Sequence, residues 1–266
     1  MSRIPHTIHY CWFGRNPLDE KSLRCIESWR KFFPDYEIIQ WNETNFDVSR
    51  IEFMQKAYND KKWAFVSDVA RLLILYHHGG VYFDTDVEAI RSFEDIIKTE
   101  TQGFFGIEQS GLVASGLGCG SVPDHPFLKS HIEVYQNMNY DTYKDHLSDI
   151  ACPNITTYLL EQEGFVRTKS RQYVSGFTIY PPEYFAPIDY NSGKMKRTKR
   201  THSIHWYNAS WQDERTKKEQ ENMRFWVSLL GHKEGETIYG ITATMRREGV
   251  VPYVQARLAK YTKNRK

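Results

Sequence analysis

The segment KWAFVSDVARLLILYHHGGVYFDTDVE, residues 62–88, decides the fold class of this chain. Its first part predicts a helix over residues 62–78 that is apolar on most of its circumference, so we expect this helix to be buried. Gly79 and Gly80 follow and end the helix. Residues 81–90 then predict a strand that leads from apolar residues to two aspartates. A buried helix that runs directly into a strand is typical of an α/β protein.

The residues before this segment predict the start of a parallel sheet. Residues 8–14 predict a strand, residues 16–33 a helix that Asn16 caps, and residues 37–41 a second strand. This strand–helix–strand order favours parallel neighbours. We therefore expect an α/β fold that binds its ligand where the strands end.

The composition excludes several classes of protein. The chain has 266 residues, of which 40% are hydrophobic and 26% charged, as in a folded globular protein. Its net charge of +2 excludes a strongly basic nucleic-acid binder, so we expect no nucleic-acid partner. The four cysteines form no CxxC pair, which excludes a zinc knuckle and a dithiol motif. The longest apolar run, LLILY at residues 72–76, is far shorter than the ~20 residues that span a bilayer, so we expect a cytoplasmic protein.

Two carboxylates at the end of the predicted strand are the clearest sign of chemistry. Asp84 and Asp86 are two residues apart, and in an extended chain such side chains point the same way. Paired carboxylates suit a hard divalent cation such as Mg²⁺ or Mn²⁺, which commonly completes its shell with substrate phosphates. A DxD sequence also occurs by chance in solvated turns. Because Asp84 follows the apolar residues Val-Tyr-Phe, a turn on an arbitrary part of the surface is disfavoured.

A second pair of charges lies inside the most apolar predicted helix. Asp68 and Arg71 are three residues apart and share one face of that helix. Buried charges are unfavourable unless they are paired or bind a ligand. Two interpretations remain open at this point: an internal salt bridge, or a pair that reaches a polar ligand at the edge of the sheet.

Five segments between the N-terminus and residue 211 carry a shared pattern. They are IPHTIHYCWFG (4–14), CIESWRKFFPDYEIIQWNE (25–43), AFVSDVARLLILYHHGGVYFDTDV (64–87), IYPPEYFAP (179–187) and HSIHWYNASW (202–211). In combination they resemble the family-32 glycosyltransferases, whose sugar-binding region contains a DxD motif, and most of all the members from bacterial capsular-polysaccharide synthesis. The last 55 residues, 212–266, fall outside this resemblance.

The resemblance implies a GT-A fold, a Rossmann-like mixed sheet flanked by helices. Residues 1–211 would form the catalytic domain, and residues 212–266 a helical, basic C-terminal extension. The implied reaction moves a sugar from a nucleotide-sugar, of the UDP-galactose or UDP-glucose type, to a saccharide or lipid-linked saccharide acceptor with retention, in capsule or exopolysaccharide synthesis. A GDP-mannose donor is the alternative, because mannosyltransferases share the pattern.

The resemblance also implies roles for individual residues. Asp84, Asp86 and His205 would bind Mn²⁺ or Mg²⁺, and Asp68 and Arg71 would bind the donor sugar and ribose. The implied catalytic residues are Asp68, Arg71, Asp84 and Asp86. The implied nucleotide-sugar contacts come from the first strand end, the buried helix, the DxD segment and the late Ser-Trp pair: His9, Trp12, Phe13, Asp68, Arg71, Tyr82, Asp84, Thr85, Ser210 and Trp211.

A retaining reaction on one face of the donor needs no strong nucleophile, and none is visible. An inverting enzyme needs a general base near the acceptor hydroxyl, for which Glu108 and Asp124 are the carboxylates that could be proposed.

Two basic segments raise the question of a membrane surface. Residues 245–266 hold seven cations, one acid and interspersed apolar residues, a composition typical either of a segment on an anionic membrane or of a solvated helix. KMKRTKR, residues 194–200, would suit acceptor phosphates or a membrane. We therefore expect a cytoplasmic enzyme, with peripheral membrane contact through 245–266 as one option.

Two rival functions use the same residues. A phosphatase of the haloacid dehalogenase type also ends an apolar strand in DxDx[TV], and FDTDV at residues 83–87 fits. That family places the motif on its first strand and needs a later acidic pair with a Gly-Asp dipeptide, which is absent after residue 87. The second rival is a non-catalytic module that binds nucleotide-sugars or glycans at the same site, and turnover of a donor would distinguish it.

Overall fold

The computed structural model describes residues 4–98, 102–208 and 214–249. The chain divides into two compact units, Met1–Ile188 with Lys196–Trp211, and Asp189–Met195 with Gln212–Lys266. The four cysteines are buried and free. Within the described ranges, no helix has both the length and the apolar character that a membrane crossing requires.

The first unit is built around a mixed sheet of eight strands among the residues described. They are β1 (Thr7–Cys11), β2 (Glu37–Trp41), β3 (Gly80–Tyr82), β5 (Gly103–Ile107), β6 (Val113–Ala114), β7 (Cys119–Ser121), β8 (Gln172–Val174) and β9 (Phe177–Tyr180). The spatial order is β2-β1-β3-β7-β5-β9-β8, with β6 paired to β5. Strand β1 is parallel to β2 and β3, β5 is parallel to β9, and β7 runs antiparallel between β3 and β5. Strands β1, β2, β3, β5 and β9 therefore end at the same edge of the sheet.

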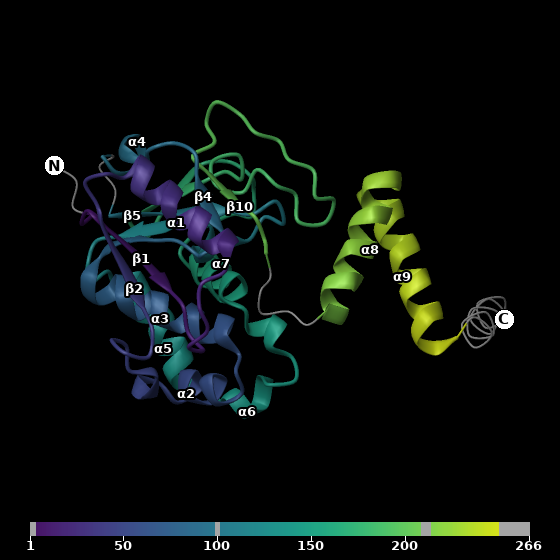
Figure 1. The fold of residues 1–266 in the computed structure, drawn as a ribbon, viewed down its shortest axis with the longest axis horizontal. Coiled ribbons are helices and arrows are strands. Elements are labelled where there is room, and N and C mark those ends of the chain that lie inside the picture. Colours follow the sequence, from purple (N-terminus) through teal and green to yellow (C-terminus); the bar gives the residue numbers. More distant parts are fainter. Residues whose placement is uncertain (1–3, 99–101, 209–213, 250–266) are drawn as a thin grey trace. The chain divides into compact units, whose positions relative to one another are not determined.

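Helices cover both faces of this sheet. They are α1 (Glu20–Phe32), α2 (Glu52–Asn59), α3 (Trp63–His78), α4 (Glu94–Ile97), α5 (Pro126–Asn137), α6 (Tyr140–Tyr143) and α7 (Cys152–Gln162), with 3₁₀ turns η1 (Val48–Arg50), η2 (Ser115–Leu117) and η3 (Leu147–Ile150). Figure 1 shows α1 and α4 on one side of the sheet and α2, α3 and α5 on the other. Each side has its own hydrophobic core, and strand β5 contributes alternate residues to the two: Phe104 to the α1 side and Phe105 to the α3 side.

A small second sheet lies on the α1 side. It pairs β4 (Val87–Ala89) with β10 (Ser203–His205) in antiparallel register. Trp29 of α1 is fully buried against it, and its indole N–H donates to the carbonyl of Val87 at 2.7 Å. This contact fixes the chain immediately after the DxD sequence.

Two predictions about these elements were wrong in detail. The predicted strand over 81–90 is two strands, because the chain turns between them and the N–H of Val87 donates to the carbonyl of Asp84 at 3.0 Å. Helix α1 begins at Glu20, and its cap is Asp19, whose carboxylate accepts the N–H of Ser22 at 2.7 Å. The carbonyl of Asn16, the predicted cap, instead accepts the indole N–H of Trp12.

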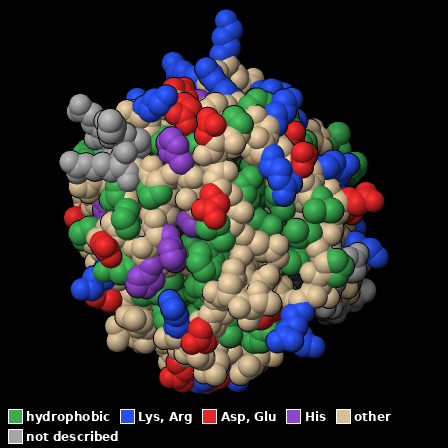
Figure 2. All heavy atoms as spheres, turned by 60° about the vertical axis from the view of Figure 1, so that its left-hand side comes forward, with side chains coloured by type: hydrophobic (Ala, Val, Ile, Leu, Met, Phe, Trp, Pro, Cys, Tyr) green, Lys and Arg blue, Asp and Glu red, His purple; other side chains and the backbone are tan. Residues whose placement is uncertain are grey.

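One face of the molecule carries charged side chains of both signs. Figure 2 shows a face with hydrophobic side chains exposed at its centre, histidines beside them, and Lys and Arg spread around the rim among Asp and Glu. Charges of opposite sign interspersed in this way agree with the small net charge of +2.

The second unit is a helical hairpin, α8 (Glu214–Leu230) and α9 (His232–Glu248), with Gly231 between them at a φ of +85°. The helices approach closely at Gly235, where a Cβ atom would lie 2.5 Å from the Cα of Val227. Val227 is buried. The hairpin leaves three large apolar side chains of α8 exposed: Phe225, Leu229 and Leu230.

Candidate metal and donor site

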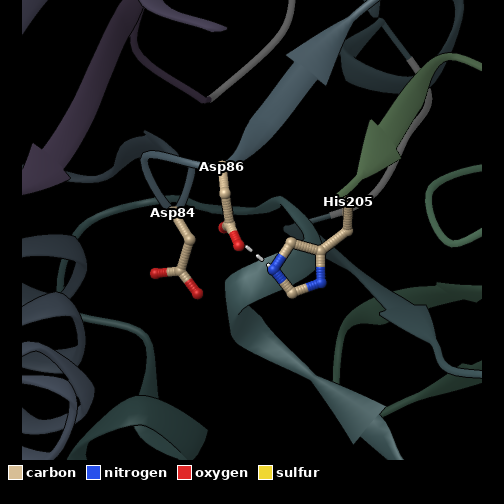
Figure 3. Close-up of side chains that lie close together, drawn as sticks. All are labelled: Asp84, Asp86 and His205. Carbon is tan, nitrogen blue, oxygen red and sulfur yellow. Dashed lines mark hydrogen bonds and ion pairs between the residues drawn. The ribbon is translucent and has the colours of Figure 1, made fainter. Parts of the chain in front are cut away.

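Three potential metal ligands converge where β3 ends. Asp84 follows β3, Asp86 precedes β4, and His205 ends β10. One ligand atom from each lies within 4.8 Å of the others. Figure 3 shows the two carboxylates and the imidazole directed toward one another. The antiparallel register that sets His205 opposite Val87 is what brings the histidine to the DxD sequence.

Asp86 is held by the segment that follows β10. Its Oδ1 lies 3.0 Å from the Nε2 of His205, and its Oδ2 accepts the backbone N–H of Asn208 at 2.8 Å. Burial by itself would raise the pKa of Asp86, but His205 and the backbone N–H groups that bind the carboxylate together outweigh it, and the net shift is downward. Burial likewise would lower the pKa of His205, and the Asp86 carboxylate raises it above its usual value. The pair is therefore a charge pair, with the carboxylate ionised and the imidazole readily protonated.

Asp84 belongs to a second network, around Arg71. Its Oδ1 lies 3.1 Å from an Arg71 guanidinium nitrogen and accepts the hydroxyl of Tyr82 at 3.2 Å. The guanidinium also lies over the Tyr82 ring, 4.8 Å from its centroid. Burial raises the pKa of Asp84, and the positive charge of Arg71 limits that rise.

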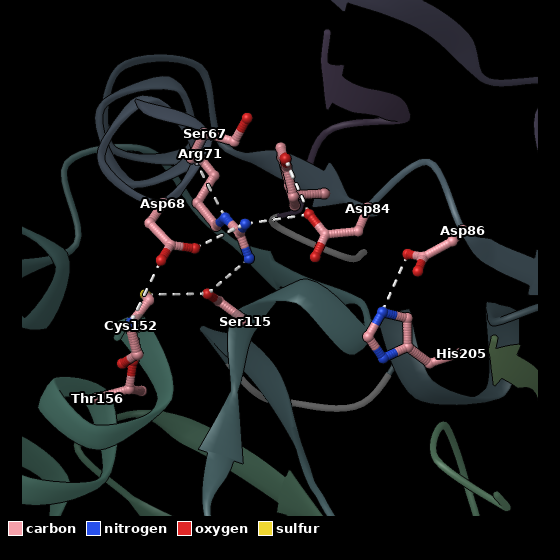
Figure 4. Close-up of polar contacts among 10 residues, drawn as sticks. Ser67, Asp68, Arg71, Asp84, Asp86, Ser115, Cys152, Thr156 and His205 are labelled. Atoms are coloured by element: carbon pink, nitrogen blue, oxygen red, sulfur yellow. Dashed lines mark hydrogen bonds and ion pairs between the residues drawn. The ribbon is translucent and has the colours of Figure 1, made fainter. Parts of the chain in front are cut away.

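The same guanidinium binds Asp68. A terminal guanidinium nitrogen of Arg71 lies 2.8 Å from Oδ1 of Asp68, and the Arg71 side chain is buried, with 5% of the residue exposed. Burial raises the pKa of Asp68 to about 6 despite this partner. Arg71 also donates to the hydroxyl of Ser115 at 3.3 Å, and the backbone N–H of Cys152 reaches Asp68 at 3.4 Å (Figure 4). The internal salt bridge that the sequence left open is therefore present, and it extends to the DxD aspartate.

The residues present fit a divalent cation. Two carboxylates and one imidazole are a common set of protein ligands for such ions. The imidazole Nδ1 of His205 is buried without a hydrogen-bond partner among the described residues, so the ring is not fully satisfied by the protein. A cation between Asp84, Asp86 and His205 would replace the direct contact between Asp86 and His205.

Gly116 was not singled out from the sequence, yet it packs against this site. A Cβ atom there would lie 2.1 Å from Oδ2 of Asp84 and 2.9 Å from a terminal nitrogen of Arg71. Its carbonyl accepts the backbone N–H of Asp84 at 3.3 Å. The signal in the sequence was the glycine-rich stretch at residues 110–121.

The remaining predicted donor contacts divide into two groups. Tyr82 and Thr85 lie at the site, beside Asp84, and Trp12 follows the end of β1 with its indole N–H bonded to the carbonyl of Asn16. The structure does not bring the side chains of His9 and Phe13 to the site around Asp84.

Both of those side chains are committed to the interior. His9 is buried, its Nε2 lies 3.0 Å from the carbonyl of Gly79, and its Nδ1 accepts the indole N–H of Trp41 at 3.1 Å. Burial lowers the pKa of His9 to about 4. Phe13 packs against Phe46 in the α3-side core.

Three further predictions have different outcomes. Ser210 and Trp211 lie outside the described residues. Asp124 follows β7, which runs antiparallel to β3 and so ends at the opposite edge of the sheet, and its N–H donates to the carbonyl of Tyr76. It cannot act as a base at this site. Glu108, at the end of β5, lies on the correct edge.

Comparison with known proteins supports the resemblance. Residues 19–103 match the family described as "Glycosyltransferase sugar-binding region containing DXD motif". The chain is 28% identical over 151 residues to inositol phosphoceramide mannosyltransferase 1 of Schizosaccharomyces pombe, covering 53% of this chain and 45% of that protein. It is 26% identical over 136 residues to alpha-1,4-N-acetylglucosaminyltransferase of Homo sapiens, covering 49% and 36%. The match thus spans less than half the length of these relatives.

The solved structures confirm the fold. The PaToxG glycosyltransferase superposes with a TM-score of 0.50 at 20% identity, over 60% of this chain and 70% of that one. The expected GT-A fold, a mixed sheet flanked by helices with further helices at the C-terminus, is confirmed. The resemblance to the DxD glycosyltransferases is likewise confirmed.

Gly116→Ala should weaken cation binding while the protein still folds. The new Cβ would collide with the end of the Asp84 side chain, which can rotate away, and so the carboxylate leaves its position. We expect the Kd for Mn²⁺, measured by electron paramagnetic resonance, to rise on the order of 10-fold or more. Gly240→Ala is the control, because its Cβ would meet no atom within 4 Å. Unchanged Mn²⁺ affinity in Gly116→Ala would contradict this account.

The charge pair makes the stability of the metal-free protein depend on pH. Because the pKa of His205 is raised above its usual 6.5, its contribution is complete below that value and is lost as the pH rises through the raised pKa. Because the pKa of Asp86 is lowered below its usual 3.8, its contribution is lost only as the pH falls through the lowered pKa.

His205→Gln keeps a neutral hydrogen-bond donor but removes the charge. It should therefore lower the melting temperature in EDTA most between pH about 4 and about 6.5, and less at about pH 9. Thermal unfolding followed by circular dichroism across this range measures the difference. A loss of the same size at every pH would mean that the charge does not contribute.

Proposed function

Because residues 19–103 carry the sugar-binding region of the DxD glycosyltransferases, we propose that this chain transfers a sugar from a nucleotide-sugar to a saccharide acceptor in a cation-dependent reaction. The observation that carries the proposal is the convergence of Asp84, Asp86 and His205 at the strand end that also holds the Arg71 network. A polar constellation of this kind at the ends of parallel strands is where α/β folds bind their ligands.

The proposed cation is Mn²⁺ or Mg²⁺, held by Asp84, Asp86 and His205. When bound, it supplies positive charge against the donor diphosphate, whose negative charge grows as the bond to the sugar breaks. Arg71 adds a fixed positive charge on the same side, and its burial strengthens that effect. Asp68 is held by Arg71 and the Cys152 N–H, which leaves its carboxylate oriented to accept hydroxyl groups of the donor sugar or ribose.

For the donor, we favour a UDP-sugar of the galactose or glucose type. GDP-mannose is the second candidate, which the mannosyltransferase name of the fission-yeast relative supports. Retention of configuration and a role in capsule or exopolysaccharide synthesis belong to the same proposal. Ser210 and Trp211 would contact the diphosphate and exclude water, although they lie outside the described residues.

The acceptor in this proposal is a saccharide, free or lipid-linked. The relative named for inositol phosphoceramide supports a lipid-linked one. The exposed apolar side chains of α8 and the basic composition of residues 245–266 support a cytoplasmic enzyme that is peripheral on the inner face of a membrane. Of that basic segment, residues 250–266 lie outside the described residues.

Asp86→Asn should abolish sugar transfer while the fold remains intact. The substitution removes a ligand charge and the partner of His205, so we expect a loss on the order of 10³-fold in transfer with Mn²⁺ present. Asp145→Asn, at an exposed position in the same unit, is the matched control and should keep wild-type activity. Transfer at the wild-type rate by Asp86→Asn would show the site assignment to be wrong.

A thermal-shift panel with UDP-, GDP- and CMP-sugars, each with Mn²⁺ and with EDTA, tests the donor class. Binding at 100 Kd stabilises a fold by ~2.7 kcal/mol, a shift of roughly 2–4 °C for a chain of this size. We expect a Mn²⁺-dependent shift with UDP-sugars. The same shift with GDP-mannose alone would select the mannosyltransferase alternative. No shift with any donor, in a folded sample, would contradict the proposal and favour the phosphatase or a module that binds glycans.

A further inference from the structure

Glu108 is a partly buried residue at the end of β5, and the proposed reaction gives its carboxylate no role. It follows β5, at the edge where β3 also ends. Its backbone is fixed in a tight turn, because its N–H donates to the carbonyl of Leu112 at 2.8 Å and its carbonyl accepts the N–H of Gly111 at 2.9 Å. Among the described residues, its side chain accepts a hydrogen bond from the hydroxyl of Ser110 at 3.2 Å. The turn therefore holds this carboxylate in place without neutralising it.

Glu108 and His205 each influence the pKa of the other. Burial raises the pKa of Glu108, and among charged groups it is His205 that opposes the rise. In turn, Glu108 is the next strongest negative charge on His205 after the two aspartates Asp86 and Asp84. Alternate residues of β5 point to opposite faces, and Glu108 has the parity of Phe104, which packs in the α1-side core together with Val87 of β4. Val87 is the residue opposite His205 in the pairing of β4 with β10. Glu108 and His205 thus lie on the same side of the sheet.

The two ring nitrogens of His205 are in different states. Nε2 is bonded to Asp86, whereas Nδ1 is buried and has no hydrogen-bond partner among the described residues. A neutral imidazole carries one N–H. When Nε2 binds a cation, that proton is on Nδ1, and a buried N–H without an acceptor is unfavourable. Metal-binding histidines ordinarily donate this N–H to a carboxylate, a carbonyl or water.

We propose that Glu108 accepts the Nδ1–H of His205, directly or across one water molecule, when Nε2 of His205 binds a divalent cation. Asp84 and Asp86 would bind the cation together with His205. Glu108 is then the carboxylate with the strongest remaining electrostatic effect on the His205 ring. Glu108 is then a positioning residue, which fixes the tautomer and the orientation of His205. This inference rests on the cation-dependent function proposed above.

The test measures cation affinity in the absence of any nucleotide or acceptor. Mn²⁺ is titrated into the full chain and followed by electron paramagnetic resonance. Glu108→Ala should raise the Kd on the order of 10- to 100-fold, the usual effect of removing such a partner. Glu108→Gln keeps a carbonyl oxygen as acceptor and should restore most of the affinity. Glu183→Ala is the matched control, because Glu183 is half-buried and pairs with Arg200 instead.

A second measurement uses the unmodified protein, so it does not depend on a variant that folds. In ¹⁵N-histidine-labelled protein with Mg²⁺, the long-range ¹H–¹⁵N spectrum should report His205 with its proton on Nδ1. A His205 ring whose Nδ1 is unprotonated with Mg²⁺ bound would overturn the proposal.

The outcomes separate this inference from the proposed function. Wild-type Mn²⁺ affinity in Glu108→Ala would overturn the inference alone, and if transfer were lost in that variant, Glu108 would act on the acceptor instead. Failure of the wild-type chain to bind Mn²⁺ and Mg²⁺ would overturn the proposed cation dependence and the inference with it.

Discussion

The buried guanidinium of Arg71 is the constraint on which the rest of the site depends. It remains positively charged at any pH at which a protein folds, and with 5% of its surface exposed it must find negative partners inside the protein. Asp68 from its own helix and Asp84 from the end of β3 supply them, at 2.8 Å and 3.1 Å. One DxD carboxylate is therefore held in its orientation by the protein's own side chains. Pre-organisation of this kind lowers the entropic cost of ordering these side chains when a ligand binds.

The other half of the site depends on a pairing between distant segments. β10 joins β4 and delivers His205 to Asp86, and Asn208 binds the same carboxylate through its backbone N–H. Since these strands are three residues long, the ligand set exists only when the first unit is folded. Cation binding and the stability of that unit are therefore linked.

The sequence predicted those features that local pattern determines. The apolar circumference of residues 62–78 predicted the buried helix α3. For its two charges the sequence left an internal salt bridge and a ligand contact open, and the structure shows the salt bridge. Side-chain periodicity does not reveal which distant groups meet, so the contact of Gly116 with Asp84 could not be predicted. For His9 the family resemblance implied a donor contact, whereas in the structure its side chain is buried and bonded to Gly79 and Trp41.

In the proposed function, Asp84, Asp86 and His205 together hold a divalent cation beside the donor diphosphate. Anomalous diffraction from crystals grown with Mn²⁺ and the nucleoside diphosphate selected by the donor panel tests it most directly. We expect one anomalous peak within about 2.0–2.3 Å of a carboxylate oxygen and of Nε2 of His205, with diphosphate oxygens completing the shell. A diphosphate bound with no peak there, or a peak coordinated by other residues, would contradict it.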